Sequence, residues 1–120
     1  MRDPFPLLKM SYEQLSLFIA QLLVYQQYLQ RKVAPSAKRN RTLRLLQALL
    51  QRLTTLFGQS TTQMALLLTV EEVIMIKEAL MVLQRALEAK SPSEGRDQEI
   101  QRLATMRTLI EQTFPSTLND

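Results

Sequence analysis

The sequence predicts an all-α fold, an antiparallel four-helix bundle with room for a short additional helix at residues 61–68. The chain has only two glycines in 120 residues, and tight turns are the structures that use glycine most. Apolar residues recur three and four positions apart in four separate segments, which is the spacing of one helix face. The connections between these segments are short, so consecutive helices are expected to run antiparallel.

The first two helices have recognisable ends. Ser11 followed by Gln14 fits a capping box, and it starts a helix expected over residues 11–33. A second helix is expected over residues 36–57. Gly58 follows it and is predicted to occupy the position after the C-cap, where helices commonly adopt a left-handed residue.

In the second half of the chain, a short segment of undecided structure is predicted to precede two helices. Residues 61–68 fit either a short helix or a buried extended segment, because a short apolar run does not decide between them. A capping box is expected at Thr69, which starts a helix running to Lys90. Ser91 followed by proline is predicted to start the last helix, which continues to Phe114.

These elements predict a simple domain organisation. Residues 1–10 are expected to form an extended leader, because they contain two prolines. Residues 11–114 are expected to form a single helical domain, and residues 115–120 a frayed tail.

The composition argues against an enzyme. The chain has no cysteine and no histidine, which removes disulfides, the usual zinc and haem ligands, and any nucleophile activated by histidine. The two groups of neighbouring acids, Glu71/Glu72 and Glu94/Asp97/Glu99, lie near expected helix starts, where the helix dipole explains them. We therefore expect no catalytic residues, no cofactor and no metal site.

Charge is distributed unevenly along the chain. Residues 1–60 hold nine Lys/Arg and two Asp/Glu, a net +7, whereas residues 61–120 have a net charge of −3. No acidic residue lies between Glu13 and Glu71. The candidate basic patch in this interval consists of Arg31, Lys32, Lys38, Arg39, Arg41, Arg44 and Arg52.

Three interpretations of the basic patch stay open at this stage. It is a solvated face paired with acids of the later helices, or it contacts nucleic-acid phosphates, or it faces an acidic protein or an anionic lipid surface. Residues 31–56 contain no aromatic residue, which disfavours binding of single strands by base stacking. A faint helix-turn-helix pattern at residues 49–68 is a further option, although its second helix would be mostly apolar.

Two helices have apolar residues on a second face. The candidate partner-binding residues are Leu17, Val24 and Tyr28 in the first helix and Ile74 and Met81 in the third. One reading is that the first helix is central and covered on both sides. The other is a protein interface, since a row of exposed apolar side chains is otherwise a liability. Ile74 and Met81 share their face with Lys77 and are expected to reach the surface.

The sequence thus predicts a non-enzymatic helical interaction protein: an adaptor, an assembly factor or a small subunit of a larger complex. Its partner is expected to be a protein, either another copy of the chain or an acidic protein, and a nucleic-acid-binding subunit is the alternative. The longest nearly apolar run, Leu15 to Tyr25, is too short to cross a bilayer. A cytoplasmic location is expected.

Overall fold

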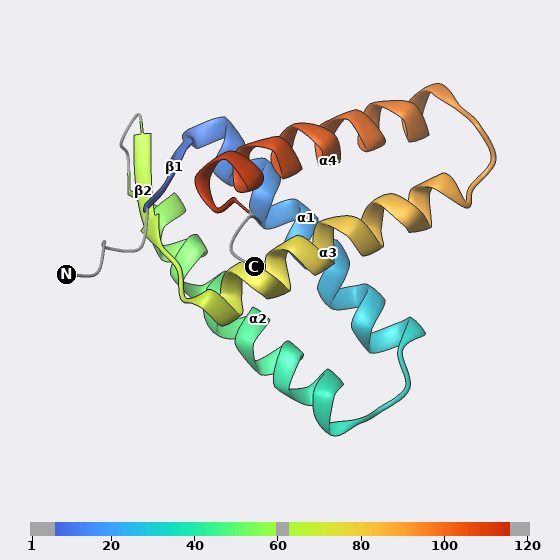
Figure 1. Cartoon of the computed structure of the whole chain (residues 1–120), viewed down its shortest axis with the longest axis horizontal. Coiled ribbons are helices and arrows are strands. Elements are labelled where there is room, and N and C mark those ends of the chain that lie inside the picture. Colours follow the sequence, from blue (N-terminus) through green and yellow to red (C-terminus); the bar gives the residue numbers. More distant parts are fainter. Residues whose placement is uncertain (1–6, 60–62, 116–120) are drawn as a thin grey trace. The chain divides into compact units, whose positions relative to one another are not determined.

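The computed structural model describes residues 7–59 and 63–115, which form four helices and two short strands (Figure 1). The elements in chain order are β1 (Leu7–Ser11), α1 (Tyr12–Lys32), α2 (Ala37–Phe57), β2 (Gln63–Leu67), α3 (Val70–Glu88) and α4 (Glu94–Thr113). The predicted all-α class is confirmed, and the helices are consistent with a helical bundle. The strand pair is an addition that the sequence did not predict as such.

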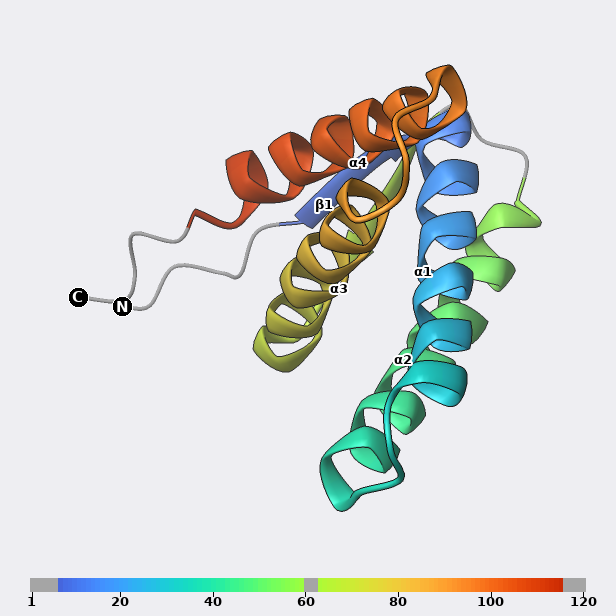
Figure 2. The same ribbon diagram turned by 90° about the vertical axis from the view of Figure 1, so that its right-hand side faces the viewer.

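Helices α1 and α2 form an antiparallel hairpin. The ring of Tyr12, at the start of α1, stacks on that of Phe57, at the end of α2, with centroids 4.4 Å apart. At the closed end, Arg39 Nε donates a hydrogen bond of 2.8 Å to the carbonyl oxygen of Leu29. The two helices lie side by side in both views (Figure 2). The residues they bury include Leu15, Phe18, Leu22, Tyr25 and Leu29 of α1 and Leu46, Leu49, Leu50 and Leu53 of α2.

Helices α3 and α4 form a second antiparallel hairpin. Lys77 Nζ lies 3.2 Å from Glu111 Oε1, and one to two turns further along, Arg107 donates a hydrogen bond of 2.8 Å to Gln84 Oε1. Along α3 the contacting residues go from Lys77 to Gln84, while their partners in α4 go from Glu111 back to Arg107. This reversed order is that of an antiparallel pair. The larger side chains buried in these two helices are Val73, Met75, Ile76, Leu80 and Leu83 of α3 and Leu103, Met106 and Ile110 of α4.

Most predicted helix ends are confirmed. Ser11 and Thr69 both form the expected capping boxes. The prediction for Gly58 was wrong, since it is itself the C-cap with a right-handed φ of −72°. The start of α4 was also placed wrongly. Its N-cap is Ser93, whose hydroxyl accepts a hydrogen bond from the backbone amide of Arg96 at 3.1 Å, so the helix begins two residues later than expected.

Of the two alternatives predicted for residues 61–68, the short helix is wrong, and residues 63–67 adopt the extended one. Residues 63–67 form strand β2, which pairs with β1 in a two-stranded sheet, and residues 61 and 62 lie outside the described part of the chain. The burial alternates as in a strand: Met64 and Leu66 are buried while Ala65 and Leu67 are exposed. The helix-turn-helix reading is wrong too, because residues 63–67, which its second helix would need, form a strand.

Contacts group the chain into two compact units. One unit is Lys9–Ala65, and the other combines Met1–Leu8 with Leu66–Asp120. The single domain expected over residues 11–114 stays a prediction. Residues 1–6 of the expected leader and 116–120 of the expected tail lie outside the described residues. Nowhere in the described ranges is a helix long and apolar enough to cross a membrane.

Candidate interaction surface

One face of α3 exposes large apolar side chains. Val70 is 59% exposed, Ile74 61% and Met81 38%. Their spacing of four and seven residues places them on one side of the helix, over about three turns. The exposed acids Glu71 and Glu78 flank them. We call these five residues the α3 face.

The side of α3 opposite this face is buried. Val73, Ile76 and Leu80 are at most 6% exposed, so the helix already buries one apolar stripe and presents a second. Ile74 and Met81 are exposed as the sequence led us to expect. Val70 was missed because it is the first helical residue. Its position four residues before Ile74 is the signal that would have found it.

Lys77 lies beside the α3 face, but its charge is matched locally. Its Nζ lies 3.2 Å from Glu111 Oε1 and donates a hydrogen bond of 2.5 Å to the carbonyl oxygen of Phe114. A pocket of about 190 Å³ next to it is lined by residues of α3 and α4, including Met81 and Arg107. Because Lys77 is paired within the hairpin, the charge that the α3 face offers to a partner is mainly that of its two carboxylates.

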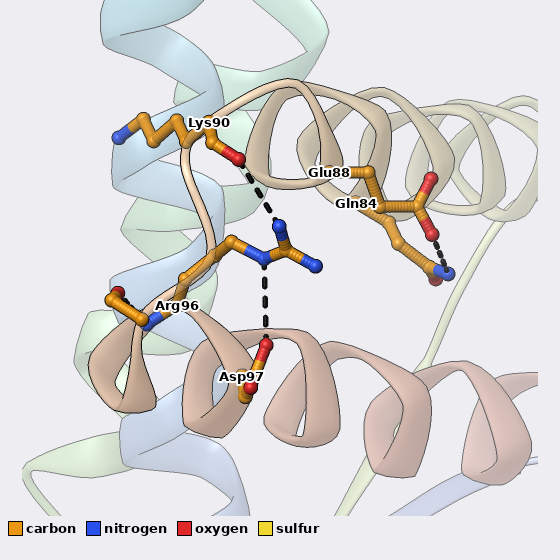
Figure 3. A network of polar contacts seen from close by, with 6 residues as sticks. Gln84, Glu88, Lys90, Arg96 and Asp97 are labelled. Carbon is orange, nitrogen blue, oxygen red and sulfur yellow. Dashed lines mark hydrogen bonds and ion pairs between the residues drawn. The ribbon is translucent and has the colours of Figure 1, made fainter.

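Other polar side chains of this hairpin are also used internally (Figure 3). Gln84 donates a hydrogen bond of 3.2 Å to Glu88. Arg96 reaches back across the α3–α4 turn, where it donates to the carbonyl oxygen of Lys90 at 3.1 Å and lies 3.4 Å from Asp97 Oδ1. The contacts of Arg96 thus join the α3–α4 turn to the start of α4.

The candidate residues of α1 make a smaller surface than the sequence suggested. Val24 is 54% exposed, but Leu17 and Tyr28 are half-buried. The ring of Tyr28 is parallel to that of Tyr25 at a centroid distance of 6.3 Å. Leu23, which the sequence reasoning did not select, is 45% exposed. Of the three predicted α1 residues, Val24 is therefore the most exposed, and Leu17 and Tyr28 contribute less surface.

The basic residues gather at the closed end of the α1–α2 hairpin. Arg31 and Lys32 occupy the last turn of α1, and Lys38 lies in the first turn of α2 with Arg41 just beyond it. All four are exposed. Among the described residues, the structure records no ion pair to any of them. Their charge is therefore available to a partner.

Arg39 has a structural role that the sequence did not reveal. It donates from Nε to the carbonyl oxygen of Leu29, and from a terminal nitrogen to that of Gln30 at 3.5 Å. These oxygens belong to the last turns of α1, where carbonyl groups lack helical partners. Arg39 thus caps α1 from the first turn of α2, and of the predicted basic patch it is the residue least available for binding.

The remaining two basic residues lie on the outer side of α2. Arg44 is exposed, and Arg52 lines an open groove of about 930 Å³. The groove is lined by Gln26 of α1 and by side chains between Gln47 and Thr55 of α2. We call it the hairpin groove. Leu50 contributes apolar surface to it, and no acidic side chain lines it.

The two compact units differ in charge. The unit Lys9–Ala65 holds eight Lys/Arg and a single acid, Glu13, a net +7, and the remaining residues have a net charge of −3. The charge asymmetry read from the sequence therefore coincides with the structural division. In the described ranges, no group of three or more acidic side chains is placed to hold a metal ion.

Comparisons with protein-family models, with curated proteins and with solved structures found no match for this chain.

Proposed function

We propose that this chain is a non-enzymatic interaction protein that acts as an adaptor, an assembly factor or a small subunit of a larger complex in the cytoplasm. It docks onto a protein partner through the α3 face, and the basic α1–α2 hairpin steers it toward acidic surface. The partner is another copy of the chain or a protein with an acidic docking segment.

The observation that carries the proposal is the second apolar stripe of α3. Val70, Ile74 and Met81 are exposed on one side of a helix whose opposite side is buried. Fully burying such a side chain contributes roughly 1.5–3 kcal/mol. Three partly exposed ones on a single stripe therefore provide a few kcal/mol toward association. That contribution is large enough to anchor a contact whose outer edge is polar.

The basic hairpin supports the second part of the proposal. Because a net charge of +7 is concentrated in one unit, it attracts an acidic partner from a distance and raises the rate of association. Exposed charges of this kind change the association rate and its salt dependence more than they change the lifetime of the complex.

A nucleic-acid-binding subunit is the alternative, and the acid-free hairpin is the feature that favours it. Two observations weigh against it. Arg39 is engaged as a cap, and Tyr28, the nearest aromatic residue in sequence to the basic end, is half-buried, so a stacking platform is missing. Contact with about five phosphates would make log K fall with log salt at a slope near −4 to −5.

The test is capture of partners from lysate of the native host, with and without nuclease. The informative variant is Ile74→Lys combined with Met81→Lys. Its matched control is Gln101→Lys combined with Gln112→Lys, which adds the same charge at exposed positions of α4.

The proposal predicts that a protein partner is captured even after nuclease treatment. Wild type and the control should capture it equally, and the α3 variant should not capture it. Equal capture by all three proteins would refute docking through the α3 face. Binding that disappears on nuclease treatment and follows the steep salt slope would support the alternative instead.

A further inference from the structure

We propose that the partner of the α3 face is the same face of a second copy of this chain, in an antiparallel α3–α3 contact with two-fold symmetry. This inference rests on the proposed function and names its partner. Three features of α3 support it: the order of its exposed apolar side chains, the order of its exposed charges, and the centre that both share.

The exposed apolar side chains of α3 can pack against those of a second copy. Ile74 is 61% exposed and Met81 38%, and both lie on one side of the helix. Their midpoint falls between residues 77 and 78. When two antiparallel helices meet at this point, Ile74 of each copy lies opposite Met81 of the other, so the same apolar contact forms twice.

The exposed charges of α3 complement themselves in the same orientation. Glu71, Glu78 and Arg85 follow at intervals of seven residues, so they lie on one flank of the apolar stripe. All three are exposed, and within the described ranges the structure records no ion pair or side-chain hydrogen bond to any of them. Because Glu71 is in the first turn of α3 and Arg85 in its last, an antiparallel copy brings its arginine to the acidic end.

The apolar and the charged pairs share one centre. Glu71 and Arg85 have their midpoint at residue 78, which lies within about 1 Å along the helix axis of the midpoint of Ile74 and Met81. One two-fold axis perpendicular to the helices therefore forms both kinds of pair at once, and it keeps the charged flanks of the two copies side by side. A parallel arrangement would instead place like charges together along the whole flank.

Glu78 makes this arrangement distinctive. It lies within about 1 Å of the two-fold axis along the helix, so its carboxylate approaches the same carboxylate of the other copy. The cation nearest to it in sequence, Lys77, is already 3.2 Å from Glu111 of its own hairpin. Like charges at this point oppose association. Glu78→Gln should therefore strengthen the dimer, whereas Glu71→Gln should weaken it.

The contact uses the same face of both copies, so it closes at a dimer. A single pair of helices buries less surface than a standard protein interface, which places the association among the weak ones. The expected solution behaviour is a weight-average mass that rises with protein concentration toward twice that of the chain and no further.

The first experiment measures the dimer dissociation constant by sedimentation equilibrium. Glu71→Lys and Arg85→Glu should each weaken association by about fivefold or more, because each puts like charges together at two symmetric places. The two substitutions in one chain should restore association to within about twofold of wild type, because the charges have exchanged places and every pair again unites opposite charges. This doubly substituted protein has the net charge of wild type.

Matched controls separate the contact from effects of net charge or of the helix dipole. Glu94→Lys changes an exposed acid in the first turn of α4, as Glu71→Lys does in α3. Arg31→Glu changes an exposed base in the last turn of α1, as Arg85→Glu does in α3. Both controls should associate within about twofold of wild type.

A second experiment tests the register of the two helices. The chain has no cysteine, so an introduced thiol can be linked only to its own copy. Glu78→Cys places the two thiols beside the axis, close to the separation that a disulfide spans, and oxidised glutathione should join the copies. Glu71→Cys is the control, because its two thiols lie roughly 20 Å apart along the helices and should remain unlinked.

Several outcomes would overturn the inference. They are a wild type that stays monomeric at its highest soluble concentration, a doubly substituted protein as impaired as the single variants, and a Glu71→Cys protein that links as readily as Glu78→Cys. The wild-type measurement needs no variant, so it remains decisive if one of them fails to fold. A monomeric wild type that still captures a host protein through Ile74 and Met81 would refute the second copy as partner and leave the proposed function standing.

Discussion

The side-chain amide of Gln21 makes the sharpest prediction about the stability of this protein. Gln21 is 5% exposed, and within the described residues neither its nitrogen nor its oxygen has a hydrogen-bond partner. A buried amide without a partner destabilises the folded state, because it gives up its hydrogen bonds to water on folding. Gln21→Met, which keeps a similar side-chain length and removes both polar atoms, should therefore stabilise the protein.

The size of the effect follows from the burial of the amide. Protein mutational data give about 1–3 kcal/mol for a buried polar group that lacks its hydrogen bond. Methionine fills irregular space well, so little of this gain should be lost to poor packing. The free energy of unfolding should thus rise by about 1–3 kcal/mol, and each kcal/mol should raise Tm by roughly 3–6 °C for a chain of this size.

Urea unfolding followed by helical circular dichroism measures this change. The midpoint should move to higher urea with an unchanged slope, the sign of a change in stability alone. The matched control is Gln27→Met, the same substitution at an exposed position of α1, and it should alter the free energy by less than about 0.5 kcal/mol. A Gln21→Met protein that is less stable than wild type, or no more stable than the control, would refute the reasoning.

Three further substitutions test the fold, each by the same urea assay. Arg39→Ala removes the hydrogen bond to the carbonyl oxygen of Leu29 and should lower the free energy of unfolding by about 1 kcal/mol. Its control is Arg41→Ala, at an exposed position, which should leave that free energy unchanged. Equal effects of the two substitutions would contradict the capping role of Arg39. Thr69→Ala breaks the capping box of α3 and should lower the free energy of unfolding by about 1 kcal/mol. An unchanged free energy would mean that the capping box does not stabilise α3. Leu46→Ala, at a side chain with 0% exposure, should cost about 2–5 kcal/mol; a loss below 1 kcal/mol would mean that the site is not closely packed.

The sequence predicted the helices well because their signals are local. The capping boxes at Ser11 and Thr69 depend on residues only three positions apart, and both form. The errors at Gly58 and Ser91 have different origins. At Gly58 the residue's own backbone amide donates a hydrogen bond of 3.1 Å to the carbonyl oxygen of Thr54, which makes it the C-cap. At the start of α4 the hydroxyl of Ser93 accepts a hydrogen bond from the amide of Arg96, so Ser93 and not Ser91 is the N-cap.

Local reasoning left residues 61–68 open between a short helix and an extended segment, and it could not select strand β2 or its partner. Its pairing partner β1 lies more than 50 residues earlier in the chain, and the apolar run at 64–68 has no helical or alternating pattern of its own. A strand in such a segment is decided by which other segment supplies backbone hydrogen bonds. The alternation of exposure along Met64–Leu67 follows from that pairing.

The candidate surfaces too could be predicted from the sequence only in part. Periodicity along α3 was sufficient to expect Ile74 and Met81 at the surface, because a helix that buries one stripe must present the opposite one. Whether a basic residue is free for a partner was decided by the tertiary structure alone. Arg39 and Arg41 look alike in the sequence, but the carbonyl groups at the end of α1 are within reach of Arg39, while Arg41 is exposed.

The sequence by itself determined the helical class, most helix ends and the charge asymmetry, since propensity, capping and net charge depend on residues close together in the chain. Only the tertiary structure decided the strand pair, the burial of Gln21 and the grouping of the charges into separate units. Those features depend on contacts between segments far apart in the chain, and no local pattern specifies which segments will meet.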